Sequence, residues 1–120
     1  MGKILLVDDS KTSRKMLREI MEGAGHEIIG EAADGEEGYL KFKELKPDLV
    51  TLDITMPKMD GLEALKLIHK EDANAKVVMI TAAGQKEKMM QAIKEGAAEF
   101  ITKPYDAEEV AKLVDKVLAQ

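Results

Sequence analysis

The sequence predicts an α/β domain in which one parallel sheet carries helices on both of its faces. Apolar runs alternate five times with segments whose apolar residues recur at helical spacing, as in successive strand–helix units. Strands joined through helices pair in parallel by right-handed crossovers, and the helices then cover both faces of the sheet. We therefore predict a doubly wound, three-layer sandwich of five strands and five helices.

The strands are predicted from short apolar runs that end abruptly in polar residues. The clearest run is residues 48–53, which has β-branched members, ends in Asp53 and precedes Met56-Pro57. A continuous apolar strand of this kind is buried on both faces, as in the middle of a parallel sheet. The other strands are expected at about residues 3–8, 27–32, 76–81 and 99–102.

The helices are predicted from their apolar periodicity and from residues suited to helix ends. They are expected at about residues 10–25, 34–46, 61–71 and 86–95, and from residue 106 onward. The expected core face of the first helix consists of Met16, Leu17, Ile20, Met21 and Ala24. Outside the helix cores, His26 and His69 are expected on the solvated surface.

Length and composition favour one ordinary globular domain. The chain has 120 residues, of which 45% are apolar and 34% charged. The net charge of −5 argues against nucleic-acid binding, and no apolar stretch approaches the ~20 residues that cross a bilayer. The absence of Cys excludes disulfides and thiolate metal sites and fits a reducing compartment. We therefore expect a cytoplasmic protein with neither a nucleic-acid nor a membrane partner.

Four of the predicted strands deliver polar residues to one edge of the sheet. Asp8 and Asp9 follow the first strand and Asp53 ends the third. Thr81 ends the fourth strand and Lys103 follows the fifth. Because the strands are parallel, their carboxyl ends meet at the edge where ligands of open α/β folds bind. The sequence therefore places three acids, a hydroxyl and an ammonium close together.

This set of side chains suits phosphoryl transfer to a carboxylate. Three neighbouring carboxylates repel one another, so the cluster is stable at neutral pH mainly when a cation shares it. Oxygen ligands without Cys or His indicate a hard cation, and a few carboxylates completed by water suit Mg²⁺ better than Ca²⁺. An anion held by the metal, Lys103 and Thr81 beside a carboxylate nucleophile is the arrangement for phosphoryl transfer to Asp53.

The whole chain resembles the receiver domains of two-component response regulators. The motifs that carry the resemblance are Asp8-Asp9, Asp53 with Met56-Pro57 and Gly61, Thr81-Ala82, and Lys103-Pro104. The resemblance covers residues 1–120 as a single receiver domain, and it implies a flavodoxin-like fold with strand order 2-1-3-4-5. Within the family, the stand-alone length and residues 53–57 and 83–85 are most similar to the chemotaxis regulators.

The resemblance implies a role for each acidic position. Asp53 would accept a phosphoryl group from a histidine kinase. Asp9 and Asp53 would bind Mg²⁺ directly, the backbone carbonyl of Thr55 would be a third protein ligand, and Asp8 would act mostly through water. Thr55 and Ala83 stand at positions that tune water access to the phosphoryl group in the family, so the lifetime of the phosphorylated state is not predicted.

The resemblance also implies a conformational switch. Lys103 and Thr81 would hold the phosphoryl oxygens. When Thr81 is drawn to that group, the ring of Phe100 would enter the vacated space and remodel the surface of the fourth helix, the fifth strand and the fifth helix. The expected target is a flagellar motor switch protein, and a phosphatase or a histidine phosphotransfer protein is a further candidate partner. The chain is expected to be a monomer.

Two alternatives remain open. A phosphorelay intermediate would use the same chemistry but pass the group from Asp53 to a histidine phosphotransfer protein. A phosphohydrolase with an aspartyl-phosphate intermediate would be a true enzyme, but dehalogenase-like phosphatases carry a second Asp where this chain has Thr55. We therefore expect no enzyme activity beyond self-catalysed phosphotransfer and autodephosphorylation.

The first helix has a basic face that is either solvated or a docking surface for the phosphodonor protein. This face consists of Lys11, Arg14, Lys15 and Arg18.

Overall fold

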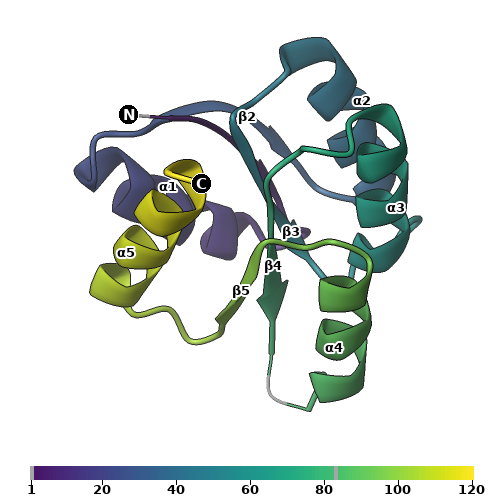
Figure 1. Ribbon diagram of the computed structural model, residues 1–120. Helices are drawn as coiled ribbons and strands as arrows, with labels where there is room; N and C mark the ends of the chain where they lie inside the picture. Colours follow the sequence, from purple (N-terminus) through teal and green to yellow (C-terminus); the bar gives the residue numbers. More distant parts are fainter. Residues whose placement is uncertain (1, 83) are drawn as a thin grey trace.

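The computed structural model describes residues 2–82 and 84–120, and it confirms the predicted α/β fold (Figure 1). Five parallel strands form one sheet in the predicted order β2-β1-β3-β4-β5. The strands are β1 (Lys3–Val7), β2 (Glu27–Ala32), β3 (Leu49–Asp53), β4 (Val77–Thr81) and β5 (Glu99–Thr102). The helices between and after them are α1 (Lys11–Gly23), α2 (Gly35–Leu45), α3 (Gly61–Glu71), α4 (Lys86–Lys94) and α5 (Ala107–Leu118). In the described part of the chain, no helix is long and apolar enough to span a membrane.

The helices form two layers, and each layer has its own core (Figure 1). α1 and α5 lie on one face of the sheet, and α2, α3 and α4 lie on the other. Successive side chains of β1 alternate between the two cores, because neighbouring residues of a strand point to opposite faces. Ile4 and Leu6 pack with α1 and α5, whereas Leu5 and Val7 pack with α2 and α3. The central strands are therefore buried on both sides, and their carboxyl edge carries the polar residues.

Side-chain caps begin four of the five helices. In each of these, an oxygen of the N-cap side chain accepts a hydrogen bond from the backbone N–H three residues later. The pairs are Ser10 with Ser13, Asp34 with Glu37, Asp60 with Glu63, and Asp106 with Glu109. α4 differs because its N-cap residue, Gln85, makes no such bond and uses its side chain elsewhere.

The tight turn between β3 and α3 depends on Gly61. Its N–H donates to the carbonyl of Ile54 at 2.8 Å, which folds the chain back on the end of β3. A Cβ atom at this position would lie 2.2 Å from the carbonyl oxygen of Asp53. Only a glycine allows this close approach, so Gly61 helps to fix the backbone that carries Asp53.

The inward face of α1 differs from the prediction. Met16 is 44% exposed and Ala24 is exposed, although the periodicity predicts both in the core. The buried residues of the helix are Ser13, Leu17 and Met21, which recur every four positions on one face. With this face against the sheet, Met16 lies on the exposed side of α1 and the side chain of Ser13 is buried.

His26 is held within the structure rather than solvated, so the surface prediction is wrong for this residue. His26 is 7% exposed, its Nδ1 accepts the N–H of Gly2 at 2.9 Å, and its Nε2 lies 2.8 Å from Asp115 Oδ1. His69 is half-buried, and its ring nitrogens lie 3.0 and 3.1 Å from two backbone carbonyl oxygens. Sequence periodicity misses such residues because their polar atoms are paired by groups from distant parts of the chain.

Candidate functional site

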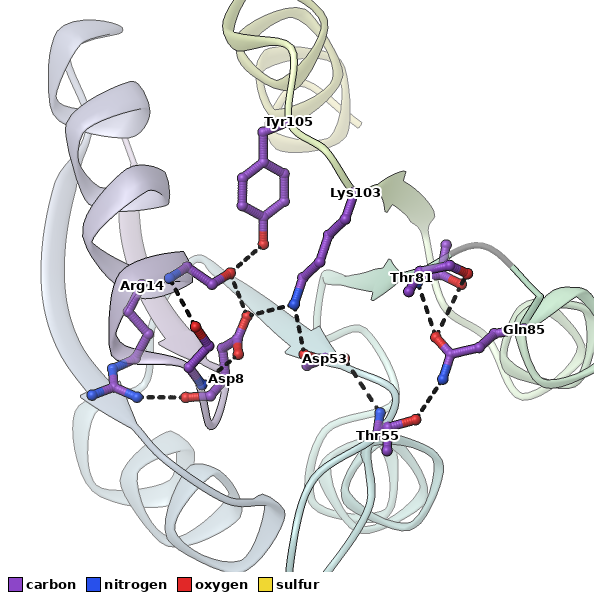
Figure 2. Close-up of polar contacts among 11 residues, drawn as sticks. Asp8, Arg14, Asp53, Thr55, Thr81, Gln85, Lys103 and Tyr105 are labelled. Carbon is purple, nitrogen blue, oxygen red and sulfur yellow. Dashed lines mark hydrogen bonds and ion pairs between the residues drawn. The ribbon is translucent and has the colours of Figure 1, made fainter.

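The predicted site residues meet at the carboxyl edge of the sheet (Figure 2). Asp8 directly follows β1 and Asp53 ends β3. Thr81 ends β4, and Lys103 directly follows β5. The register of β3 with β4 places Asp53 opposite Ile80, next to Thr81. Residues from four strands therefore share one site.

Three carboxylates form the acidic part of the site. Oxygen atoms of Asp8, Asp9 and Asp53, one from each, lie within 4.8 Å of one another. Asp8 and Asp53 are buried, whereas Asp9 is exposed. Carboxylates at this spacing repel one another unless a cation lies among them. The donors are all oxygen, so the cluster can hold a metal, and its chemistry fits a hard divalent cation such as Mg²⁺.

Lys103 supplies a fixed positive charge beside two of these acids. Its Nζ donates to Asp53 Oδ2 at 3.1 Å and lies 3.5 Å from Asp8 Oδ2 (Figure 2). Burial works to lower the pKa of Lys103, but the hydrogen bond to Asp53 and the charges of both acids outweigh it and raise the pKa. The lysine therefore remains an ammonium ion at neutral pH.

The surroundings of Asp53 disfavour its charged form, whereas those of Lys103 favour its charged form. Burial raises the pKa of Asp53, and the negative charge of Asp8 raises it further. The hydrogen bond from Lys103 and the N–H of Thr55, 3.3 Å from Asp53 Oδ1, work in the opposite direction without cancelling the effect of burial. The ionised Asp53 is therefore a carboxylate whose negative charge is only partly compensated by the protein.

Gln85 joins the two loops on the other side of Asp53 (Figure 2). Its Nε2 donates to Thr55 Oγ1, and its Oε1 accepts the N–H of Ala82 at 2.9 Å. The hydroxyl of Thr81 lies 3.1 Å from the carbonyl oxygen of Ala82 and 3.4 Å from Gln85 Oε1. Gln85 thus bridges the loop after β3 and the loop after β4, and it contacts Thr81. The sequence gives no signal for this bridge, because it depends on how the two loops face each other.

Of the remaining predicted site residues, Thr55 contacts this centre. The backbone N–H of Thr55 contacts Asp53, so the backbone of Thr55 borders the acidic cluster, and its carbonyl remains a predicted ligand. Phe100 is half-buried in β5 and packs against the core on the α2–α3–α4 side. Ala83 lies outside the described residues.

Asp8 is surrounded by donors that the sequence analysis did not identify. Its Oδ1 accepts the N–H of Ser10 at 2.8 Å, and its Oδ2 accepts the hydroxyl of Ser13 at 2.6 Å. The hydroxyl of Tyr105 lies 2.6 Å from Ser13 Oγ, and Arg14 Nη1 donates to the backbone carbonyl of Asp8 at 2.6 Å. Burial raises the pKa of Tyr105 more than the hydrogen bond with Ser13 lowers it. The nearness of Tyr105 to Lys103 in the sequence is the only signal that could have indicated it.

The basic face of α1 is partly neutralised. Arg14 Nε lies 2.9 Å from Glu31 Oε1, and Arg18 Nη2 lies 2.6 Å from Glu31 Oε2. These hydrogen bonds outweigh the effect of burial and lower the pKa of Glu31. Lys11 and Lys15 are exposed. Two of the four basic residues therefore fasten α1 to the end of β2, and the two lysines keep their charges on the surface.

Residues 4–115 match the family described as the response regulator receiver domain. The chain belongs to this family. This receiver domain is 49% identical to the chemotaxis protein CheY of Thermotoga maritima and 45% identical to CheY of Bacillus subtilis, over 98% and 97% of both chains. It is also similar to a chain in the crystal structure of the CheX–CheY–BeF₃–Mg²⁺ complex from Borrelia burgdorferi. The TM-score is 0.93 and the identity 43%, with coverage of 98% of this chain and 90% of that chain.

We expect Asp53→Asn to stabilise the metal-free receiver domain at pH 7 by roughly 1 kcal/mol. The raised pKa of Asp53 means that the folded protein binds this proton more tightly than the unfolded chain does. Stability is therefore lost as the pH rises through the folded pKa. The advantage of the variant should be full above that pKa and should vanish below the unfolded value of about 3.9.

Urea unfolding in a chelating buffer at several pH values measures this difference. Asp72→Asn, at an exposed position just after α3, should leave the free energy of unfolding nearly unchanged. A lower stability of the Asp53 variant at pH 7, or an equal gain from Asp72→Asn, would contradict this interpretation of the site.

Proposed function

We propose that this receiver domain accepts a phosphoryl group on Asp53 from a histidine kinase and thereby changes its binding surface. The contact between a buried carboxylate and a part-buried ammonium beside two further acids carries the proposal: Lys103 Nζ lies 3.1 Å from Asp53 Oδ2. A nucleophilic carboxylate, a fixed cation and a metal-binding cluster in one site are the components of phosphoryl transfer to an aspartate. Similarity to chemotaxis proteins over the whole chain supports the same conclusion.

The transfer is a displacement at phosphorus. An oxygen of Asp53 forms a bond to phosphorus while the bond between phosphorus and the imidazole nitrogen of the donor breaks. The donor nitrogen keeps the electron pair of the broken bond and takes a proton from water, which gives a neutral imidazole. Lys103 would exchange its contact with the carboxylate for one with a phosphoryl oxygen. Asp9, Asp53 and the backbone carbonyl of Thr55 would hold the cation directly, and Asp8 would act mostly through water. Mg²⁺, when bound, supplies the second positive charge that the phosphoryl oxygens require.

Thr81 has to change its hydrogen bonds before it can hold a phosphoryl oxygen. Its hydroxyl now lies against the Ala82 carbonyl and the Gln85 side chain. Turning toward Asp53 would break these contacts and would vacate space beside β5, into which the half-buried ring of Phe100 could move. Gln85 therefore stabilises the resting arrangement of Thr81.

The output surface in this proposal consists of α4, β5 and α5. Met90 and Ile93 of α4 are 53% and 44% exposed, whereas Met89 of the same helix packs against the core. Exposed apolar side chains on α4 suit a binding surface, and in this proposal that surface changes with phosphorylation. The target would be a flagellar motor switch protein. The domain would act as a cytoplasmic monomer, and it would not turn over other phosphorylated substrates.

Mass spectrometry after treatment with acetyl phosphate and Mg²⁺ tests the phosphoacceptor. The wild-type chain should gain the mass of one phosphoryl group, and Asp53→Asn should gain none because the nucleophilic carboxylate is missing. Asp72→Asn should gain the group as the wild type does, and a chelator should prevent the gain. Modification of the Asp53 variant at the wild-type level would refute the assignment.

Gln85→Ala should favour the phosphorylated arrangement, because the Gln85 contacts with Thr81 and Thr55 exist in the resting one. A net hydrogen bond contributes about 1 kcal/mol, so its loss should tighten binding of beryllofluoride, a phosphoryl mimic, about fivefold. Calorimetry in the presence of Mg²⁺ measures this affinity. Gln91→Ala, an exposed change on the same helix, should leave it unchanged. Weaker or equal binding by Gln85→Ala would show that Gln85 does not stabilise the resting arrangement of Thr81.

A further inference from the structure

Two hydroxyl groups connect α1 and the segment after β5 to the acidic cluster. Ser13 Oγ lies 2.6 Å from Asp8 Oδ2, and the hydroxyl of Tyr105 lies 2.6 Å from Ser13 Oγ (Figure 2). Ser13 and Tyr105 are 92 residues apart in the sequence. Ser13 occupies the first position of the buried stripe of α1, where an apolar residue would normally pack. A buried hydroxyl at such a position needs a polar partner, and here it has two.

The chemistry of these groups fixes the direction of the hydrogen bonds. The hydroxyl of Ser13 is the donor in its contact with Asp8 Oδ2, because a carboxylate oxygen accepts hydrogen bonds. Ser13 therefore donates its single proton to Asp8. Because that proton is used, Tyr105 must donate its own proton to Ser13 Oγ. The result is a series of two hydrogen bonds, in which Tyr105 donates to Ser13 and Ser13 donates to Asp8.

These hydrogen bonds restrain the orientation of the Asp8 carboxylate. The N–H of Ser10 holds Oδ1, Ser13 holds Oδ2, and the side chain is fully buried. The ring of Tyr105 packs against the core on the α1–α5 side, so its hydroxyl is offered to Ser13 from a fixed position. Hydrogen-bond partners that orient metal-binding carboxylates in this way strongly affect metal affinity.

We propose that Ser13 and Tyr105 are positioning residues that fix Asp8 for cation binding, with Tyr105 acting only through Ser13. The inference rests on the proposed Mg²⁺ site and adds two residues to it. Neither residue would touch the phosphoryl group or the metal. Their effect is to hold the Asp8 carboxylate in one orientation near Asp9 and Asp53, so that binding the cation does not require Asp8 to be ordered at the same time.

A double-mutant cycle with Mg²⁺ as the ligand tests the proposal. Ser13→Ala should weaken Mg²⁺ binding about tenfold, because Asp8 loses a donor. Tyr105→Phe should weaken it by a smaller factor, about threefold, because Ser13 still donates. The double variant should bind Mg²⁺ no more weakly than Ser13→Ala alone, since the effect of Tyr105 passes through Ser13. Calorimetric titration of each full-length chain with MgCl₂ gives the dissociation constants.

Tyr39→Phe is the matched control. It removes the same atom from the other tyrosine of the chain, whose hydroxyl donates to Glu71 Oε1 on the exposed surface. Its Mg²⁺ affinity should equal that of the wild type. Wild-type affinity in both Ser13→Ala and Tyr105→Phe would overturn the positioning role, and additive losses in the double variant would overturn the serial chain. Failure of the wild type itself to bind Mg²⁺ would instead refute the proposed metal site.

Tyrosine fluorescence gives a second readout that does not require a stable Ser13 variant. The chain has two Tyr and no Trp, so in the Tyr39→Phe background Tyr105 is the only strong emitter. Saturating Mg²⁺ polarises Asp8 and should change the Tyr105 emission through the hydrogen-bond chain. Unchanged emission at a Mg²⁺ concentration that saturates the calorimetric titration would contradict the connection.

Discussion

The ion pair between Lys103 and Asp53 sets the charge balance at the carboxyl edge of the sheet. Three carboxylates lie within 4.8 Å of one another, and Lys103 is the side-chain cation that contacts two of them. One ammonium cannot balance three negative charges, so the site retains a negative potential that favours a divalent cation. In the proposed phosphoryl transfer, the same ammonium would also offset the charge of the phosphoryl group. The parallel sheet makes this possible, because it brings the ends of β1, β3 and β5 to one edge.

Two polar connections lead away from this ion pair in opposite directions. On one side, Gln85 links the loops that follow β3 and β4 and contacts Thr81. On the other side, Ser13 and Tyr105 link Asp8 to α1 and to the segment before α5. In the proposed function, the first connection would rearrange during switching. The second would remain fixed, because it would orient an acid of the proposed metal cluster.

The main features of the fold and the site could be predicted because they depend on local pattern. Apolar runs that end in Asp8, Asp53 and Thr81 identify strands and their carboxyl ends without knowledge of tertiary contacts. The same motifs carry the resemblance to the receiver family, which implied the strand order, and both the family and the order were confirmed. The metal and phosphoryl-transfer roles of these residues remain proposals that the experiments above address.

The features that could not be predicted depend on contacts between distant segments. Periodicity predicts Met16 on the core face of α1 and does not predict Ser13 there. A buried Ser is recognised only when its partners, Asp8 and Tyr105, are known. His26 was assigned to the surface for the same reason, since its partners come from the chain start and from α5. Polar residues can be buried wherever the fold supplies matching groups, and a single sequence does not show those groups.

In the proposed function, a charge change at Asp53 controls the surface of α4, β5 and α5. Calorimetric titration of an N-terminal peptide of a flagellar switch protein, in Mg²⁺ with and without beryllofluoride, measures this coupling. Binding should tighten on the order of tenfold or more when the phosphoryl mimic occupies Asp53. Equal affinity in the two conditions would contradict the coupling between Asp53 and this surface. Absence of binding in both would contradict the choice of partner and would favour transfer to a histidine phosphotransfer protein.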